Sequence, residues 1–327
     1  MPETLIGLDI GGTKCAVIYG RAEGDKLEIA DKAGFPTETN LGLDHTLNAI
    51  YRQIDMIIER NGLNSDKVRA IGISCGGPLD SKTGVIMSPP NLPGWDNVPL
   101  VKLLSDRYGI KAGVQNDANA CALAEWKFGA GKGTENMIFM TFGTGLGAGL
   151  IINGSLYAGT NDMAGEVGHI RLSGFGPVGY GKAGSWEGFC SGGGIAQLAR
   201  TMVMEKFQMG ESVSFCKSAD DLNNINAQVV AEAAMKGDKL AIEIYRISGE
   251  YLGRGLSVLI DILNPEMIVI GSIFARSRKL LEAYAMEVIR KEALFHSADV
   301  CRIVPAQLGE DLGDYAALSV ASNLLQK

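Results

Sequence analysis

The sequence predicts an α/β fold of two domains with a cleft between them. A chain of 327 residues, 46% of them hydrophobic, can bury more than one ordinary core, and its length favours two domains. Strand-like and helix-like segments follow one another along the chain, as they do in α/β proteins. Each half also contains two short strands about a glycine turn, which is a weak indication of internal duplication.

The first half is expected to open with three strands, the first two joined by the turn GGTK. Apolar residues then recur at helical spacing from Leu47 to Ile58. A strand-like segment, VRAIGIS, follows, and a proline-rich loop at 88–99 separates it from a second group of elements. The expected order is strands at 4–10, 15–20 and 27–34, a helix to 60, a strand at 68–74, a helix at 99–108, a strand at 112–115 and a helix at 118–128.

The second half is expected to repeat the opening pattern around the turn GTGLG. Its later part has a long helical period and a short buried strand, MIVIG. The expected elements are strands at 136–142 and 147–152, a helix at 239–263, a strand at 267–271, a helix at 277–292, a strand at 300–303 and a helix at 311–325.

Composition excludes several classes of function. The net charge is −7 and no basic stripe exists to displace counterions, so we expect no nucleic-acid partner. No signal peptide or membrane span is recognisable, and the six cysteines form no CxxC pair. We therefore expect a cytoplasmic protein with reduced thiols. A nucleotide remains compatible, because backbone N–H groups and a divalent cation can hold its phosphates.

The first candidate site is LDIGGTK, where Asp9 lies in an apolar strand just before a two-glycine turn. A buried carboxylate is costly unless it is paired or bound to a cation. The exposed N–H groups of the turn, with Thr13 and Lys14 as further donors, suit phosphate oxygens and hydrated Mg²⁺. An ordinary hairpin in which Asp caps the turn explains the same residues equally well.

The second candidate is TFGTGLGAG at 141–149, where glycines alternate between apolar strands. Such glycines weaken a strand unless something approaches its backbone closely, and a second phosphate turn would explain them. The usual nucleotide signatures are missing. The segment GAGKGT at 129–134 lacks the spacing of a P-loop, and no GxGxxG opens a helix after a strand.

The third candidate is the pair Asn116 and Asp117, which stands at the junction of a strand and a helix. Asp at a helix start is commonly an N-cap. The alternative is that Asp117 takes a proton from a substrate hydroxyl while Asn116 binds a neighbouring hydroxyl. Sequence position does not decide between the two.

The fourth candidate is the glycine-rich stretch from Glu166 and His169 to Glu187. Carboxylates that each accept two hydrogen bonds can bind the adjacent hydroxyls of a sugar. A zinc site would require four nitrogen or sulfur ligands at characteristic spacing, and only His169 has that chemistry before Cys190. A surface histidine in a flexible loop is the remaining interpretation.

Seven blocks in order resemble the ROK family of sugar kinases, open reading frames and repressors. They cover nearly the whole chain: IGLDIGGTK, GISCGGPLD, PPNLPGWDNVPL, QNDANACALAE, FMTFGTGLGAGLIINGSLYAGTNDMAGEVGH, WEGFCSGGGI and IVIGSIF. The resemblance implies two ribonuclease-H-like domains of the actin, Hsp70 and hexokinase superfamily that close on ATP and sugar. We expect one domain from 1–116 with 311–327 and the other from 117–310.

The resemblance also implies roles for individual residues. Asp117 would be the catalytic base, and Asp9 would hold Mg²⁺ through water. The sugar contacts would be Asn91, Asn116, Asp117, Glu166, His169 and Glu187. The nucleotide contacts would be Asp9, Gly11, Gly12, Thr13 and Lys14 in the first phosphate element, Thr141, Gly143, Thr144 and Gly145 in the second, and Gly271 and Ser272 beside the nucleoside.

The chain departs from the family pattern in two places. Family members commonly have three cysteines that join the histidine on structural zinc, and the matching positions here are Val178, Tyr180 and Ser185. We therefore expect no zinc, and a loop ordered by packing of Tyr180 and Trp186. The usual paired glycine of the nucleoside motif is Gly271-Ser272 here, which leaves the choice of nucleotide open. The repressors carry a helix-turn-helix before the first strand, and this chain begins with the strand.

The expected function is ATP-dependent phosphorylation of a hexose or N-acetylhexosamine, at the 6-hydroxyl most common in the family, by a homodimer. One alternative is a catalytically weak sugar sensor of the same fold. Another is an ATPase of the Hsp70 or actin type with a protein partner, against which the Glu166, His169 and Glu187 cluster speaks. The identity of the sugar is not readable, because an epimer changes affinity too little to be recognised from residue types.

Overall fold

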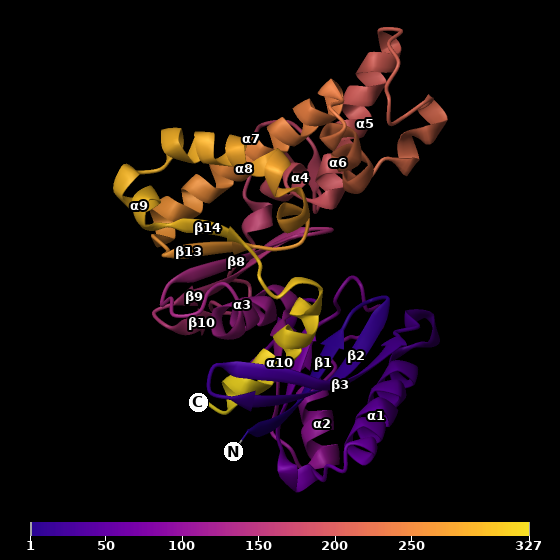
Figure 1. Cartoon of the computed structure of the whole chain (residues 1–327). Helices are drawn as coiled ribbons and strands as arrows, with labels where there is room; N and C mark the ends of the chain where they lie inside the picture. Colours follow the sequence, from indigo (N-terminus) through magenta and orange to yellow (C-terminus); the bar gives the residue numbers. More distant parts are fainter. Residues whose placement is uncertain (1, 327) are drawn as a thin grey trace. The chain divides into compact units, whose positions relative to one another are not determined.

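The computed structural model describes residues 2–326 as mixed α/β, which confirms the predicted fold class (Figure 1). The chain divides into two compact units. The first comprises residues 1–135, 149–164 and 307–327, and the second comprises 136–148 and 165–306. No helix among the described residues is long and apolar enough to cross a membrane.

The first unit contains a five-stranded sheet of order β3-β2-β1-β4-β7. β1 is antiparallel to β2 and parallel to β4, and β4 is parallel to β7. The strands are β1 Glu3–Ile10, β2 Lys14–Glu23, β3 Lys26–Pro36, β4 Val68–Cys75 and β7 Ala112–Asn116. Two short strands, β5 Leu79–Asp80 and β6 Val85–Ile86, form a separate hairpin.

Helices cover both faces of this sheet. Ile6 and Leu8 of β1 belong to the core that includes α1 Leu43–Arg60 and α2 Leu100–Tyr108, whereas Leu5 belongs to the core that includes α10 Leu312–Leu324. Side chains alternate along a strand, so Asp9 lies on the same face as Leu5, toward α10.

The approach of α10 to the sheet depends on Gly72. A Cβ at this residue would lie 2.2 Å from the carbonyl oxygen of Ala317 in α10. Glycine at residue 72 therefore lets the helix pack directly on the strand backbone.

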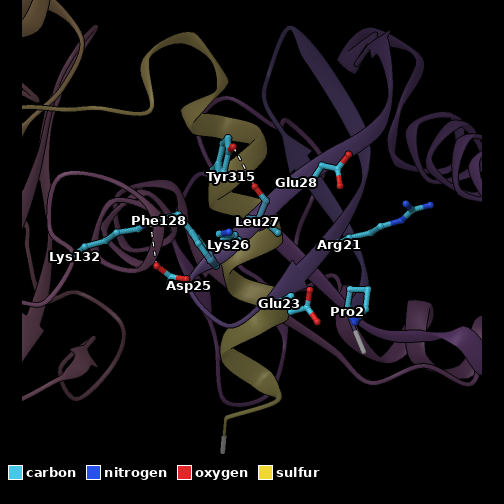
Figure 2. A pocket seen from close by; sticks show the side chains of 10 residues that line it. All are labelled: Pro2, Arg21, Glu23, Asp25, Lys26, Leu27, Glu28, Phe128, Lys132 and Tyr315. Carbon is cyan, nitrogen blue, oxygen red and sulfur yellow. Dashed lines mark hydrogen bonds and ion pairs between the residues drawn. The ribbon is translucent and has the colours of Figure 1, made fainter.

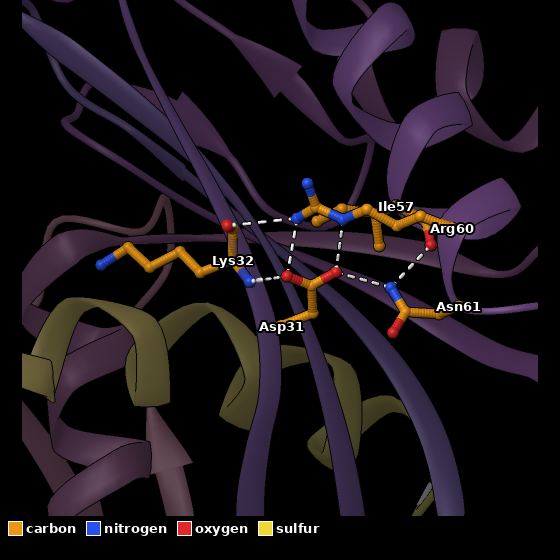
Figure 3. A network of polar contacts seen from close by, with 5 residues as sticks. All are labelled: Asp31, Lys32, Ile57, Arg60 and Asn61. Atoms are coloured by element: carbon orange, nitrogen blue, oxygen red, sulfur yellow. Dashed lines mark hydrogen bonds and ion pairs between the residues drawn. The ribbon is translucent and has the colours of Figure 1, made fainter.

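Asp31 of β3 fastens the sheet to the end of α1 (Figure 3). Its carboxylate accepts hydrogen bonds from Arg60 Nε at 2.5 Å, Arg60 Nη2 at 2.6 Å and Asn61 Nδ2 at 2.6 Å. These bonds lower the pKa of Asp31 against the opposing effect of burial. The bidentate geometry makes this contact more specific than an ordinary surface ion pair.

The second sheet has the order β10-β9-β8-β13-β14, and the boundary between the compact units runs through β9. Its strands are β8 Met137–Phe142, β9 Leu146–Ile152, β10 Ser155–Tyr157, β13 Met267–Ile270 and β14 Arg302–Pro305. The helices of the second unit are α4 Trp186–Phe189, α5 Gly192–Gln208, α6 Ala227–Met235, α7 Lys239–Leu263, α8 Ile273–Glu292 and α9 Phe295–Val300.

Some elements differ from those expected. The strand expected at 300–303 lies at 302–305, because α9 occupies the residues up to 300. The helix expected from 277 begins at 273 and has non-helical dihedral angles at Ser277. α5 and α6 were not expected: α5 begins with three glycines, which are poor helix formers, so its start is not apparent in the sequence.

The compact units also do not divide at residue 116. α3 Asp117–Phe128 belongs to the first unit, because it packs on α10. The rings of Phe128 and Tyr315 lie 6.4 Å apart, and Lys127 Nζ donates to Asn323 Oδ1 at 3.1 Å. The domain boundary expected between residues 116 and 117 therefore does not coincide with a boundary between compact units.

Candidate functional site

The first glycine turn connects β1 to β2 and is anchored from outside by Thr37. Gly11 N donates to Lys14 O at 3.1 Å, and the fully buried Thr37 donates its hydroxyl to Gly11 O at 2.6 Å. A Cβ at Gly12 would lie 2.4 Å from the carbonyl oxygen of Asn91. The turn is thus fixed in place and touches Asn91, while Thr13 and Lys14 stay exposed.

Asp9 is the penultimate residue of β1 and lies beside the first turn of α10. A Cβ at Gly313 would lie 3.1 Å from Asp9 Oδ2, and the next residue, Asp314, is buried and paired with Lys32 at 2.6 Å. Burial raises the pKa of Asp9 to about 6, assisted by the negative charges of Asp314 and Asp117. Such a carboxylate gains most from a nearby cation, so Asp9 fits the chemistry of a hydrated Mg²⁺ site.

Asn116 and Asp117 have different roles at the start of α3. Asn116 is the N-cap, because its Oδ1 accepts the backbone N–H of Asn119 at 2.7 Å. Asp117 is the first helical residue, and its Oδ1 accepts the N–H of Ala118 at 2.8 Å. The capping function that the sequence left open for Asp117 therefore belongs to Asn116.

Asp117 is an exposed residue, yet desolvation by the protein atoms near its carboxyl group raises its pKa. The parallel ladder places Asp9 opposite Ser74 of β4, and Ser74 opposite Gln115 of β7. Asp9 and Asp117 therefore stand at the carboxyl ends of strands in one sheet, the usual edge for ligand binding in α/β proteins.

The second glycine turn lies in the second unit, between β8 and β9. Gly143 N donates to Gly145 O at 3.0 Å, and Gly143 O accepts the N–H of Gly192, the first residue of α5, at 2.8 Å. A Cβ at Gly143 would lie 3.4 Å from Ser272 Oγ and 3.7 Å from Thr141 Oγ1. The structure thus brings the turn expected to bind phosphate together with the expected nucleoside residue Ser272, which follows Gly271 after the end of β13.

A pocket of about 780 Å³ opens beside this turn, and every residue that lines it belongs to the second unit. Thr144 and Ser272 line it together with the N-terminal turn of α5, and α6 contributes Gln228 and Glu232. Backbone N–H groups at a helix start favour anionic ligands. The pocket is therefore large enough and suitably lined for a nucleotide.

The first unit has a pocket of about 600 Å³ of a different character (Figure 2). It contains none of the expected site residues. Its lining combines charged side chains of both signs with the aromatic rings of Phe128 and Tyr315. Some of the charges are paired, since Lys132 Nζ lies 3.9 Å from Asp25 Oδ2. The arrangement points to no particular ligand.

Glu187 and the turn that carries His169 lie together in the second unit. Glu187 Oε2 accepts the N–H of Leu146 at 3.0 Å, and a Cβ at Gly145 would lie only 2.8 Å from the same oxygen. A Cβ at Gly168 would lie 3.2 Å from Glu187 Cβ. Glu166 and His169 flank this glycine and are exposed, so both can reach a ligand.

The residues at the positions matched to the family's zinc cysteines have other surroundings and contacts. Ser185 is buried and caps α4 by accepting the N–H of Gly188 at 3.2 Å, and Val178 lies in a short strand. Among residues 2–326, no three His, Cys, Asp or Glu side chains are grouped to hold a metal ion. Trp186 is fully buried, as expected, but Tyr180 is 81% exposed and therefore does not order the loop through core packing.

Several residues of this region were not identified from the sequence. Thr37 and Asp314 act through contacts with segments distant in the chain, which no local pattern reveals. The α5 terminus carries a recognisable cap, since Ser191 Oγ accepts the N–H of Gly194 at 2.9 Å. A serine three residues before that glycine was the available signal.

Known proteins resemble this chain in sequence and in fold. The profile of the ROK family matches residues 5–323. A glucokinase from Halalkalibacterium halodurans is 33% identical over 94% of this chain and 92% of its own. A similar solved structure is that of a ROK family glucokinase from Streptomyces griseus in complex with glucose and AMPPNP. Its sequence is 29% identical to this one, the match covers 98% of this chain and 99% of that chain, and the TM-score is 0.74.

A ROK hexokinase from Thermus thermophilus covers 99% of both chains, with 26% identity and a TM-score of 0.80. Both structures are of ROK enzymes, and each of them, like the family profile, matches nearly the whole chain. The chain therefore belongs to the ROK family.

Proposed function

We propose that this ROK-family sugar kinase transfers the γ-phosphoryl group of ATP to the 6-hydroxyl of a hexose or an N-acetylhexosamine. The similarity to glucokinases over nearly the full chain supports the reaction class. The observation that supports the mechanism is that Asn116, and not Asp117, caps α3. Because Asn116 caps the helix, Asp117 is not needed as the cap and can serve as a base with a raised pKa.

In this mechanism Asp117 accepts the proton of the sugar hydroxyl as that oxygen attacks the γ-phosphorus, and the bond from the γ-phosphorus to the bridging oxygen breaks so that ADP leaves. The raised pKa of its carboxyl group favours the transfer, since a base with a higher pKa holds the proton more strongly. The N–H groups of the two glycine turns stabilise charge on the phosphate oxygens. Mg²⁺, held by Asp9 through water, would neutralise further phosphate charge.

The nucleoside is assigned to the pocket of the second unit, beside Gly271 and Ser272. Support comes from the pocket volume and from its continuity with Gly143 and Thr144. The family resemblance assigns the sugar to Glu187, His169 and Glu166 of the second unit and to Asn91, Asn116 and Asp117 of the first. Glu187 is the best fixed of these, because Leu146 N holds one of its oxygens.

The proposal includes a cytoplasmic homodimer without structural zinc. Its support is the family resemblance and the occupation of the cysteine positions by Val178, Tyr180 and Ser185.

The test is a coupled assay of ADP release with a panel of hexoses and N-acetylhexosamines at saturating Mg-ATP. We expect turnover with at least one sugar and none without sugar. A folded protein that binds a sugar but turns over none would instead be the weak sensor. ATP hydrolysis that no sugar stimulates would contradict the assignment of a carbohydrate acceptor.

A further inference from the structure

The segment between His169 and Glu187 contains a two-stranded hairpin. β11 Val178–Gly179 pairs with β12 Lys182–Ala183 through a turn whose two residues, Tyr180 and Gly181, have φ angles of 43° and 73°. Positive φ at both positions is characteristic of a tight two-residue hairpin turn. An isolated hairpin of this length is not stable in water, so other contacts must hold it.

One of these contacts comes from Gln197 on α5. Its Oε1 accepts the N–H of Val178 at 3.0 Å, and its Nε2 donates to the carbonyl oxygen of the same residue at 2.8 Å. One amide side chain thus pairs with β11 as a neighbouring strand would. The Val178 side chain is 43% exposed, so its own burial contributes little to holding β11.

The hairpin backbone lies directly against Glu187. A Cβ at Gly179 would lie 2.8 Å from Glu187 Cβ and 2.7 Å from Gly188 N. Gly179 O also accepts the Ser185 hydroxyl at 3.4 Å. Any outward movement of β11 would therefore remove the surface that packs on one side of Glu187.

The hairpin also contacts the backbone and ring of His169. Lys182 Nζ donates to His169 O at 2.7 Å. The ring of Tyr180 meets the His169 imidazole edge to face, with centroids 6.4 Å apart. A single small element therefore touches two of the residues that the proposed function assigns to the sugar, Glu187 and His169.

We propose that Gln197 is a positioning residue for sugar binding, which fixes the β11–β12 hairpin against Glu187 and His169 by its paired hydrogen bonds to Val178. The inference rests on the proposed function, because it assumes that Glu187 and His169 bind the sugar. Gln197 itself touches no substrate. Its loss acts on the sugar side of the site and leaves the nucleotide pocket intact.

The test variant is Gln197→Met, which keeps the length of the side chain and removes its hydrogen bonds. We expect KM for the sugar to rise roughly tenfold, as for the loss of one or two hydrogen bonds, with KM for ATP unchanged. The matched control is Gln208→Met, the same change at the exposed end of α5, and it should retain the wild-type constants.

A second variant, Gly179→Ala, pushes the hairpin away from Glu187 by steric contact and should raise the same KM. Hydrogen exchange provides an independent readout, because the Val178 amide should lose protection in Gln197→Met and keep it in Gln208→Met. Unchanged sugar KM in Gln197→Met, or an equal rise in both KM values, would overturn the inference. A wild-type enzyme that phosphorylates no sugar would instead overturn the proposed function.

Discussion

Replacing Asp117 with Asn removes the proposed base and changes little else. Asn keeps an Oδ1 that can accept the N–H of Ala118, and the helix cap resides on Asn116. Folding stability should therefore stay level or rise slightly, because a carboxylate whose pKa is raised by desolvation is replaced by a neutral group. A positioned base contributes roughly 10²–10⁴-fold, so kcat should fall by at least ~100-fold, or about 3 kcal/mol of barrier.

The assay is steady-state kinetics with the best sugar, combined with sugar titration by calorimetry and a thermal melt. Sugar affinity should be retained within the same order of magnitude. The matched control is Asp44→Asn, the same change at an exposed residue in the first turn of α1, which should turn over normally. An Asp117→Asn enzyme that is folded and turns over at the wild-type rate would refute the assignment.

Four further predictions follow from the site. First, kcat/KM of the wild type should fall on acidification with an apparent pKa above that of an ordinary aspartate, because Asp117 must be ionised to accept the proton; a profile flat through this region would contradict it. Second, the pKa of Asp9 is raised from its ordinary value of 3.8 to about 6 in the folded protein, so the folded state binds this proton more tightly than the unfolded state does. The free energy of unfolding therefore falls as the pH rises from about 4 to about 6. Asp9→Asn should therefore raise the free energy of unfolding at neutral pH, by up to about 3 kcal/mol, and give little gain near pH ~4; denaturant melts that show an equal gain at both pH values would oppose this. Third, Gly193→Leu should raise KM for ATP and spare the sugar, since a Cβ there has no contact closer than 3.8 Å and the side chain would enter the pocket; an unchanged KM for ATP would exclude the nucleotide from this pocket. Fourth, metal analysis of the purified protein should find no stoichiometric zinc, and a tightly held equivalent would contradict the proposed order of the loop.

Sequence periodicity predicted the elements that are regular and long. The helix at 239–263 lies at its expected bounds, because its apolar residues recur at helical spacing without interruption. α5 was missed, because its glycine-rich start resembles the loop before it. A helix can therefore be predicted where its apolar residues recur regularly. A helix that begins with glycines, as α5 does, is not distinguished from a loop by its composition.

The chemistry of the site could be predicted only in part. The sequence left open whether Asp117 caps α3 or acts as a base, and it did not identify Asn116 as the cap. The 2.7 Å hydrogen bond from Asn119 N to Asn116 Oδ1 shows that Asn116 is the cap. The contacts of Asp314 with Lys32 and of Gln197 with Val178 depend on tertiary packing. No spacing rule connects such partners before the fold is known.

The most direct test of the central claim is phosphorus NMR of the products formed by the wild-type protein and Asp117→Asn with Mg-ATP and the best sugar. We predict ADP and an equimolar sugar phosphate ester on the primary hydroxyl with the wild type, and no ester on the same time scale with the variant. ADP accompanied only by inorganic phosphate, or ester formed equally by both proteins, would contradict a kinase in which Asp117 activates the sugar hydroxyl.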